Sequence, residues 1–277
     1  MIQFFGYLPF GIIYAISRFL RFVLQFIVRY RFNTIKENLE RCFPNFEENE
    51  ILSILGKNYK NLATIIVEGI KGLSLSKEEL MRRNQFIGIE PVQNLLASGK
   101  SVILICPHTN NWEWTVLASG YYFPDKTIGI YKEIRNSYIE KYIYTLRSRC
   151  SMQLISTRYT RLINEEIPKG RAILLMSDQN PSNTKDAIQS YFFGEKIPVL
   201  HGLEKYARQY KLPVYYLDQK RISPGYYQVS VSLLSNNSSE LKETELTQLF
   251  MSKVEECIRR DPSSWLWSHR RWKHLNT

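Results

Sequence analysis

Histidine is scarce in this chain of 277 residues, which has four in all, so the surroundings of each can be considered singly. His108 follows a short apolar run, 101–106 (SVILIC), and Glu113 comes five residues later. Side chains that follow strands of a parallel sheet gather at the edge where ligands bind. A carboxylate bonded to one imidazole nitrogen fixes the tautomer, and the other nitrogen can then take a proton from a hydroxyl. The pair therefore predicts a general base, His108, oriented by Glu113.

Two other interpretations of this segment stay open. Spacing alone is a weak signal, because acidic residues are common, and His108 could be a loop residue that is merely hydrogen-bonded. Cys106 lies two residues before His108, so a thiolate nucleophile is conceivable. The apolar run around Cys106 instead predicts a buried and inert thiol.

A basic stretch supplies the next candidates. Residues 135–171 contain eight lysines and arginines against three glutamates, a net charge of +5. Within it, Arg147 and Arg149 could stabilise an oxyanion or hold a phosphate. The alternative is a solvated basic face.

One aspartate also follows a strand-like run. Asp178 comes just after the apolar run 171–176, so it could share the crevice of His108. The alternative is an aspartate that caps the turn before Pro181.

The N-terminal segment is rich in apolar residues as far as residue 28, and its only charged side chains are Arg18 and Arg21. A helix that spans a membrane needs about 20 apolar residues, a length reached here only if both arginines are included. The segment predicts a membrane anchor over residues 1–30 that spans the bilayer or lies in its interface; a buried core helix is the alternative. Arg29 and Arg31 follow directly and suit the anionic cytoplasmic leaflet.

The remainder, 31–277, reads as one domain in which strands alternate with helices, a pattern typical of an α/β sheet covered on both faces. Strands are predicted over 101–106, 127–131, 152–155, 171–176, 213–217 and 226–233. Helices are predicted over 47–72, 91–98, 112–122, 136–147, 159–167, 199–210 and 243–260.

Composition narrows the class of partner. The formal net charge of +11 and the pI near 9.4 suggest nucleic acid, anionic lipid or an acidic protein. A mean hydropathy of −0.28 excludes a polytopic membrane protein. The four cysteines are scattered, which excludes a disulfide scaffold and favours a reducing compartment. The segment 265–273 mixes tryptophans with cations. This pattern fits a site that binds nucleic acid, a segment at a membrane interface, or a packed terminal helix.

Six segments, taken together and in order, resemble the bacterial late lipid A acyltransferases, the lauroyl/myristoyl transferase family of the lysophospholipid acyltransferase superfamily. The resemblance covers nearly the whole chain and includes the His-x4-Glu motif that ends at Glu113. The segments are Arg31 with 38–39 and 43–44, 108–113, 146–149 with 152–155, 177–179, 192–194 with Pro198 and 202–204, and 262–273.

The resemblance implies a mixed central sheet flanked by helices, behind an N-terminal anchoring helix. It implies transfer of an acyl chain from acyl carrier protein to a hydroxyl of a lipid A precursor, at the anionic inner membrane with the domain on its cytoplasmic side. It implies no metal or redox cofactor and no nucleic acid. The implied roles are general base for His108, orienter for Glu113, oxyanion or phosphate binding for Arg147 and Arg149, second essential acid for Asp178, and substrate contact for Asn111 and Gln179.

Two other functions compete with this one. The same chemistry could act on another acceptor, such as an amino-acid lipid or a lysophospholipid. Alternatively, the chain could be a basic module that binds membrane or nucleic acid without catalysis, in which case the pairing of His108 with Glu113 would have no purpose.

Overall fold

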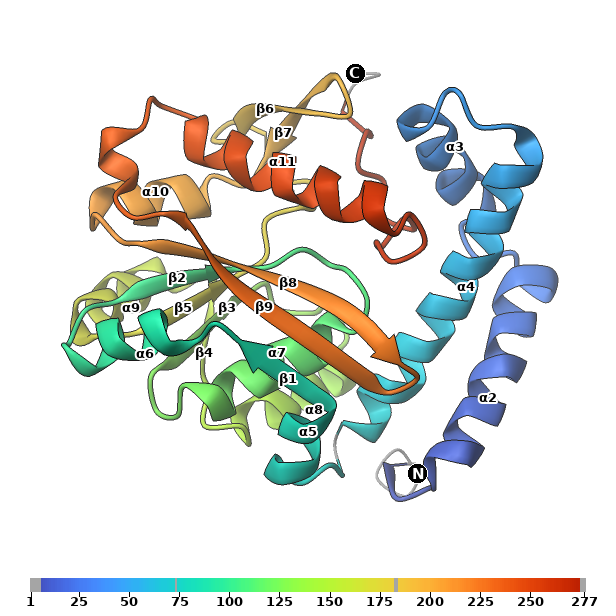
Figure 1. Cartoon of the computed structure of the whole chain (residues 1–277), viewed down its shortest axis with the longest axis horizontal. Helices are drawn as coiled ribbons and strands as arrows, with labels where there is room; N and C mark the ends of the chain where they lie inside the picture. The colour runs from blue at the N-terminus through green and yellow to red at the C-terminus, as the bar shows by residue number, and fades with distance from the viewer. Residues whose placement is uncertain (1–5, 73, 182–183, 275–277) are drawn as a thin grey trace.

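The computed structural model of the chain describes residues 6–72, 74–181 and 184–274. Its centre is a seven-stranded sheet of order β1-β9-β8-β2-β5-β3-β4 (Figure 1). All neighbouring strands are parallel except the hairpin of β8 and β9. The predicted α/β fold with a mixed central sheet is therefore confirmed. The strands are β1 Asn84–Ile87, β2 Val102–Ile105, β3 Thr127–Tyr131, β4 Gln153–Ser156, β5 Ala172–Leu175, β8 Val214–Ser223 and β9 Tyr226–Ser235.

Helices cover both faces of this sheet. Along β2, Ile103 and Ile105 join the core beneath α4, α10 and α11, whereas Val102 and Leu104 join the core beneath α5, α6 and α7. A strand buried on both sides reads as a continuous apolar run, which is why β2 was recognisable. The helices of the domain are α3 Phe32–Cys42, α4 Glu48–Lys71, α5 Lys77–Arg83, α6 Glu90–Ala97, α7 Trp112–Tyr122, α8 Ser137–Ser148, α9 Thr160–Glu166, α10 Gly202–Gln209 and α11 Glu245–Arg260.

The structure contains several elements that were not predicted. They are the helices α3 and α5, the edge strand β1, and a small antiparallel sheet of β6 Ile188–Phe192 with β7 Glu195–Val199. The helix expected from residue 199 begins at Gly202, because Val199 still belongs to β7. The segment 265–273, for which a packed terminal helix was one of three interpretations, forms turns.

The N-terminal helix lies along α4 at the edge of the molecule (Figure 1). α2, Phe10–Phe22, continues into a π-helical stretch, η1, Val23–Ile27. Ile13 and Ser17 are buried against the domain. Together, α2 and η1 form a helix over Phe10–Ile27 that is long and apolar enough to cross a membrane, and only 11 % of this segment is buried.

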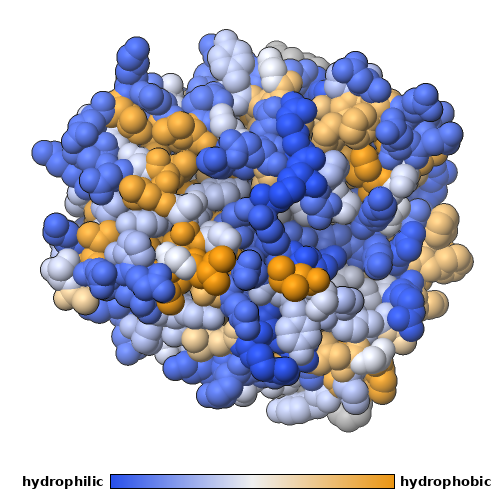
Figure 2. All heavy atoms as spheres, viewed as in Figure 1, coloured by the Kyte–Doolittle hydropathy of each residue, from blue (hydrophilic) through white to orange (hydrophobic). Residues whose placement is uncertain are grey.

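The outward side of this helix is aromatic. Phe19, Phe22 and Phe26 are each more than half exposed, and hydrophobic residues reach the surface where Figure 1 draws α2 (Figure 2). Exposed phenylalanines on one side of a helix are typical of a surface that meets lipid. Residues 1–5 of the predicted anchor lie outside the described residues.

We expect this aromatic side to drive binding to lipid vesicles. Replacing Phe19, Phe22 and Phe26 by serine should lower the partition coefficient by about tenfold per residue, since each loses an apolar ring that lipid would bury. Sedimentation with anionic vesicles measures the effect. Tyr191→Ser, at an exposed position on β6, is the matched control, and equal losses in both proteins would contradict the assignment.

Candidate active site

His108 and Asp178 meet at one edge of the sheet. β2 and β5 are parallel neighbours, so the residues that follow them emerge side by side. Nδ1 of His108 lies 2.6 Å from Oδ1 of Asp178, and the backbone N–H of His108 donates to Oδ2 at 2.9 Å. The Asp178 side chain is fully buried, whereas 17 % of the His108 side chain is exposed. The two residues form a dyad with its imidazole open to solvent.

Asp178 is held in its ionised form. Nε1 of Trp265 donates a third hydrogen bond to the carboxylate at 2.8 Å. Burial alone would raise the pKa of Asp178, but the charge of His108 and these hydrogen bonds outweigh it and lower the pKa to about 2. An ionised acceptor at Nδ1 assigns the proton to that nitrogen. Nε2 is then the nitrogen that can accept a proton.

Glu113 does not contact His108, contrary to the expectation from spacing. It accepts hydrogen bonds from Nη2 of Arg147 at 2.9 and 3.1 Å and from Nε1 of Trp112 at 3.2 Å. The reason is that Glu113 lies on the first turn of α7, where it faces the last turn of α8, which carries Arg147. Asp178 thus occupies the position beside the imidazole that was expected for Glu113.

The Glu113–Arg147 pair nevertheless stays close to the dyad. The ring of Trp112 stands edge-on to the imidazole of His108, with centroids 5.3 Å apart, and its Nε1 bonds to Glu113. Both members of the ion pair are mostly buried, with side chains 18 % and 16 % exposed. A partly desolvated guanidinium is therefore linked to His108 through Glu113 and Trp112.

The remaining predicted residues have other surroundings. Arg149 donates to the carbonyls of Gly72 and Leu75, next to the end of α4. Asn111 is fully buried and caps α7, its Oδ1 accepting from the Trp114 N–H at 3.1 Å. Gln179 follows Asp178 at the strand end and is half-buried.

The C-terminal segment is the part of the site that the sequence did not reveal. Besides Trp265, it supplies the N–H of Leu266, which donates to the carbonyl of His108 at 3.1 Å, and the carbonyl of Ser264, which accepts from the N–H of Asn110 at 2.9 Å. Trp265, Trp267 and Trp272 are buried. Their tryptophan–cation pattern was noticed, but it fits core and interface equally, and burial now shows that these rings are core.

One alternative for the chemistry loses support. Cys106 is buried, and burial raises the pKa of its thiol well above the ordinary value, so it is not a thiolate nucleophile.

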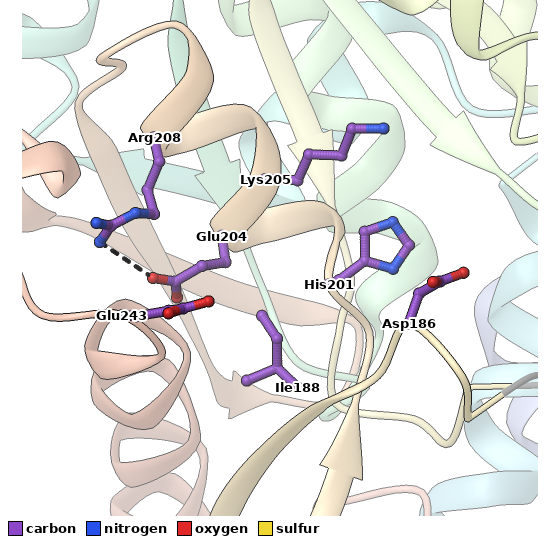
Figure 3. Close-up of a pocket in the computed structure, with 7 residues that line it drawn as sticks. All are labelled: Asp186, Ile188, His201, Glu204, Lys205, Arg208 and Glu243. Atoms are coloured by element: carbon purple, nitrogen blue, oxygen red, sulfur yellow. Dashed lines mark ion pairs between the residues drawn. The ribbon is translucent and has the colours of Figure 1, made fainter.

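A cavity of about 640 Å³ lies beside α10 and is lined in part by His201 (Figure 3). Glu204 in this cavity accepts from the N–H and hydroxyl of Thr247 on α11, a structural contact. The described residues that line the cavity include none of those predicted for the site: Asp186, Ile188, His201, Glu204, Lys205, Arg208 and Glu243.

Comparison with known proteins decides the family. The model of the family described as bacterial lipid A biosynthesis acyltransferase matches residues 1–274. The chain belongs to this family. It is an acyltransferase, as the resemblance of its motifs predicted. It is 24 % identical to the lipid A biosynthesis lauroyltransferase of Escherichia coli, over 96 % of this chain and 87 % of the relative.

Other relatives carry related names. A lipid A biosynthesis acyltransferase of Haemophilus influenzae is 23 % identical over 83 % of this chain and 72 % of its own length. The lipid A biosynthesis palmitoleoyltransferase of E. coli is 20 % identical over 86 % and 77 %. The names of the two E. coli relatives specify different acyl groups, so family membership sets the reaction class and leaves the acyl chain open.

The dyad predicts a defined response to acid. Because the pKa of Asp178 is lowered in the folded protein, its ionised form stabilises the fold above the ordinary pKa of 3.8, and this contribution is lost as pH falls towards 2. Asp178→Asn should lack this component, which is on the order of 2 kcal/mol. Urea unfolding at pH 2, 3, 4 and 6 measures it. Parallel stability curves for both proteins would contradict the assignment.

Proposed function

We propose that this acyltransferase moves a fatty acyl chain from a thioester on acyl carrier protein to a hydroxyl of a lipid A precursor, at the cytoplasmic face of the inner membrane. The observation that carries the proposal is the hydrogen bond between His108 and the buried Asp178. This hydrogen bond orients His108 as a base that can take a proton from a substrate hydroxyl. The relatives of the chain are named for lipid A acyl transfer.

In the proposed reaction, Nε2 of His108 takes the proton of the acceptor hydroxyl as its oxygen attacks the thioester carbonyl. The C–O bond forms, and the carbonyl oxygen becomes an oxyanion. Collapse of this intermediate breaks the C–S bond, and the thiolate takes the proton from Nε2. Asp178 holds the ring throughout and stabilises the imidazolium. The substrate supplies the hydroxyl, so no serine is needed.

Arg147 is proposed to stabilise the oxyanion, or a phosphate of the glycolipid, and Glu113 to position Arg147. Two contacts support this assignment: the ion pair itself, and Trp112, which touches both the pair and His108. A guanidinium held by a carboxylate is pre-organised, so it does not have to reorder as negative charge develops. Arg149 and Asn111 receive no chemical role here, because the contacts of both are structural.

Surface and charge support the proposed location and partners. The outward side of α2 is aromatic, and Arg29 and Arg31 follow it, the order expected for a helix held at an anionic cytoplasmic leaflet. A net charge of +11 suits both an acidic carrier protein and a phosphate-bearing lipid. Burial of the C-terminal tryptophans removes the aromatic platform that single-stranded nucleic acid would need.

The decisive experiment incubates the purified protein with acyl carrier protein thioester and lipid A precursor, and mass spectrometry follows the product. A gain of one acyl chain is expected, and its mass gives the chain length. The lipids of a deletion strain complement this test. Unchanged lipid A together with a missing aminolipid or phospholipid would show that the enzyme acylates another acceptor.

We expect His108→Ala to lower kcat by about 10²–10⁴-fold, since proton transfer by a positioned base contributes that much. Asp178→Asn should approach the same loss, because the asparagine favours the wrong imidazole tautomer. Initial rates at saturating thioester measure both. A His108→Ala enzyme that runs at the wild-type rate would eliminate His108 as the base.

Glu113 and Arg147 should behave as one unit. Glu113→Gln and Arg147→Met each break the same ion pair, so their combined loss should fall short of the sum of the single losses by about 1–3 kcal/mol. Rates of the two single variants and the double variant complete the cycle. Full additivity would show that the pair does not act together.

A further inference from the structure

A buried carboxylate outside the proposed chemistry lies behind the His108 loop. Glu68, on α4, has no exposed surface. Its Oε1 accepts from the hydroxyl of Tyr14 at 2.8 Å, and its Oε2 accepts from Nδ2 of Asn111 at 2.7 Å and from the hydroxyl of Tyr227 at 2.6 Å. These donors come from α2, the start of α7 and β9. One side chain thus joins three elements that are distant in sequence.

Asn111, which donates to Glu68, lies three residues after the proposed base, His108. Asn111 caps α7 through its Oδ1, which leaves Nδ2 to be fixed by Glu68. Its carbonyl accepts from Nε2 of Gln219 at 3.0 Å. His108 lies in the loop 106–111 between β2 and α7, so Glu68 holds the far end of the segment that carries the base.

The bond to Tyr14 reaches the helix with the aromatic outer side. Tyr14 and Ser17 lie one turn apart on the inward side of α2, and the Ser17 hydroxyl meets that of Thr64 at 3.3 Å. Residues three apart share a helix face, so Tyr14 and Ser17 meet α4 beside the buried Ile13, while Phe19 and Phe22 point outward. The same carboxylate therefore bonds both to α2 and to the end of the His108 loop.

We propose that Glu68 is a positioning residue for the His108 loop and that, through Tyr14, it ties this loop to the docking of α2. An isolated buried carboxylate is strongly unfavourable. Three directed donors from α2, the start of α7 and β9, together with the nearby charge of Arg221 on β8, offset that penalty. The network therefore depends on all of these elements being in place. This inference rests on the proposed function for its kinetic consequence but not for its structural one.

Asn111→Asp tests the link while keeping the cap. Aspartate caps a helix as well as asparagine does, but it replaces the donor to Glu68 by a second acceptor. We expect faster backbone hydrogen exchange over residues 107–113 and a kcat lowered by about 10–100-fold with KM little changed, because a small displacement of the base is sufficient for such a loss. Wild-type exchange and kcat in this variant would overturn the proposal.

The double variant Glu68→Gln/Asn111→Asp supplies the rescue. The amide of the introduced glutamine can donate to the introduced aspartate and to Tyr227 while its oxygen still accepts from Tyr14, so the hydrogen bond is reversed instead of removed. Slow exchange and most of the kcat should return. A double variant no better than Asn111→Asp would overturn the pairing, since the two changes would then be independent.

Tyr14→Phe tests the connection to α2, with Ser17→Ala as the matched control. Both remove one hydroxyl from the contact with α4, but only Tyr14 bonds to Glu68. Exchange over residues 107–113 should rise in Tyr14→Phe and stay at the wild-type rate in Ser17→Ala. Equal exchange in both variants would overturn the tie to α2. If the wild-type protein transfers no acyl chain while the exchange pattern holds, the proposed function fails and the positioning role stands.

Discussion

The site depends on one buried negative charge. Asp178 lies at the end of β5 with no exposed surface, and a carboxylate can stay ionised there only if directed donors replace water. Two donors come from His108 and one from Trp265. Satisfying this charge brings the end of β2, the end of β5 and the C-terminal segment to one place. The same charge then orients the imidazole, so one interaction serves both the fold and the proposed chemistry.

α4 supports this arrangement from behind. Near its middle, Nδ2 of Asn58 donates to the carbonyl of Trp265 at 2.8 Å, and Nδ2 of Asn61 donates to that of Ser264 at 3.0 Å. Further along the helix, Glu68 holds Asn111. Amide and carboxyl groups in the interior of a helix are usually solvated, so their burial on one face of α4 is informative. That face binds the C-terminal segment and the His108 loop, the two pieces of chain that enclose Asp178.

The sequence was most informative where structure is local. A fully buried strand is a continuous apolar run, so β2 and β5 and the polar residues that follow them were predictable. The partner of His108 was not, although Asp178 was expected to share its crevice. Spacing suggested Glu113 because it lies five residues away, whereas strand order places Asp178, seventy residues away, beside the imidazole. Which strands become neighbours is a property of the whole sheet.

The C-terminal segment was ambiguous for a different reason. Tryptophans alternating with arginines fit a wet interface and a packed core equally well, and only burial separates them. In the structure the Trp265 ring is buried while its Nε1 serves Asp178. A tryptophan side chain is large and apolar but carries one N–H, so it can fill the core and still donate a hydrogen bond to a buried carboxylate. The β6–β7 hairpin was missed because each of its strands has only five residues and Pro198 lies within the second, and a proline argues against a strand.

The conformation of the His108 loop shows why several supports are needed. Asn110 adopts a left-handed conformation with φ of 47°, which disfavours a residue with a Cβ by about 1 kcal/mol. Its Nδ2 donates to the carbonyl of Gln219 at 3.0 Å and its N–H to that of Ser264 at 2.9 Å. A strand end alone would let the following residues relax into an extended path. Because neighbouring elements hold the loop at this residue, His108 stays where its Nδ1 meets Asp178, with 17 % of its side chain exposed.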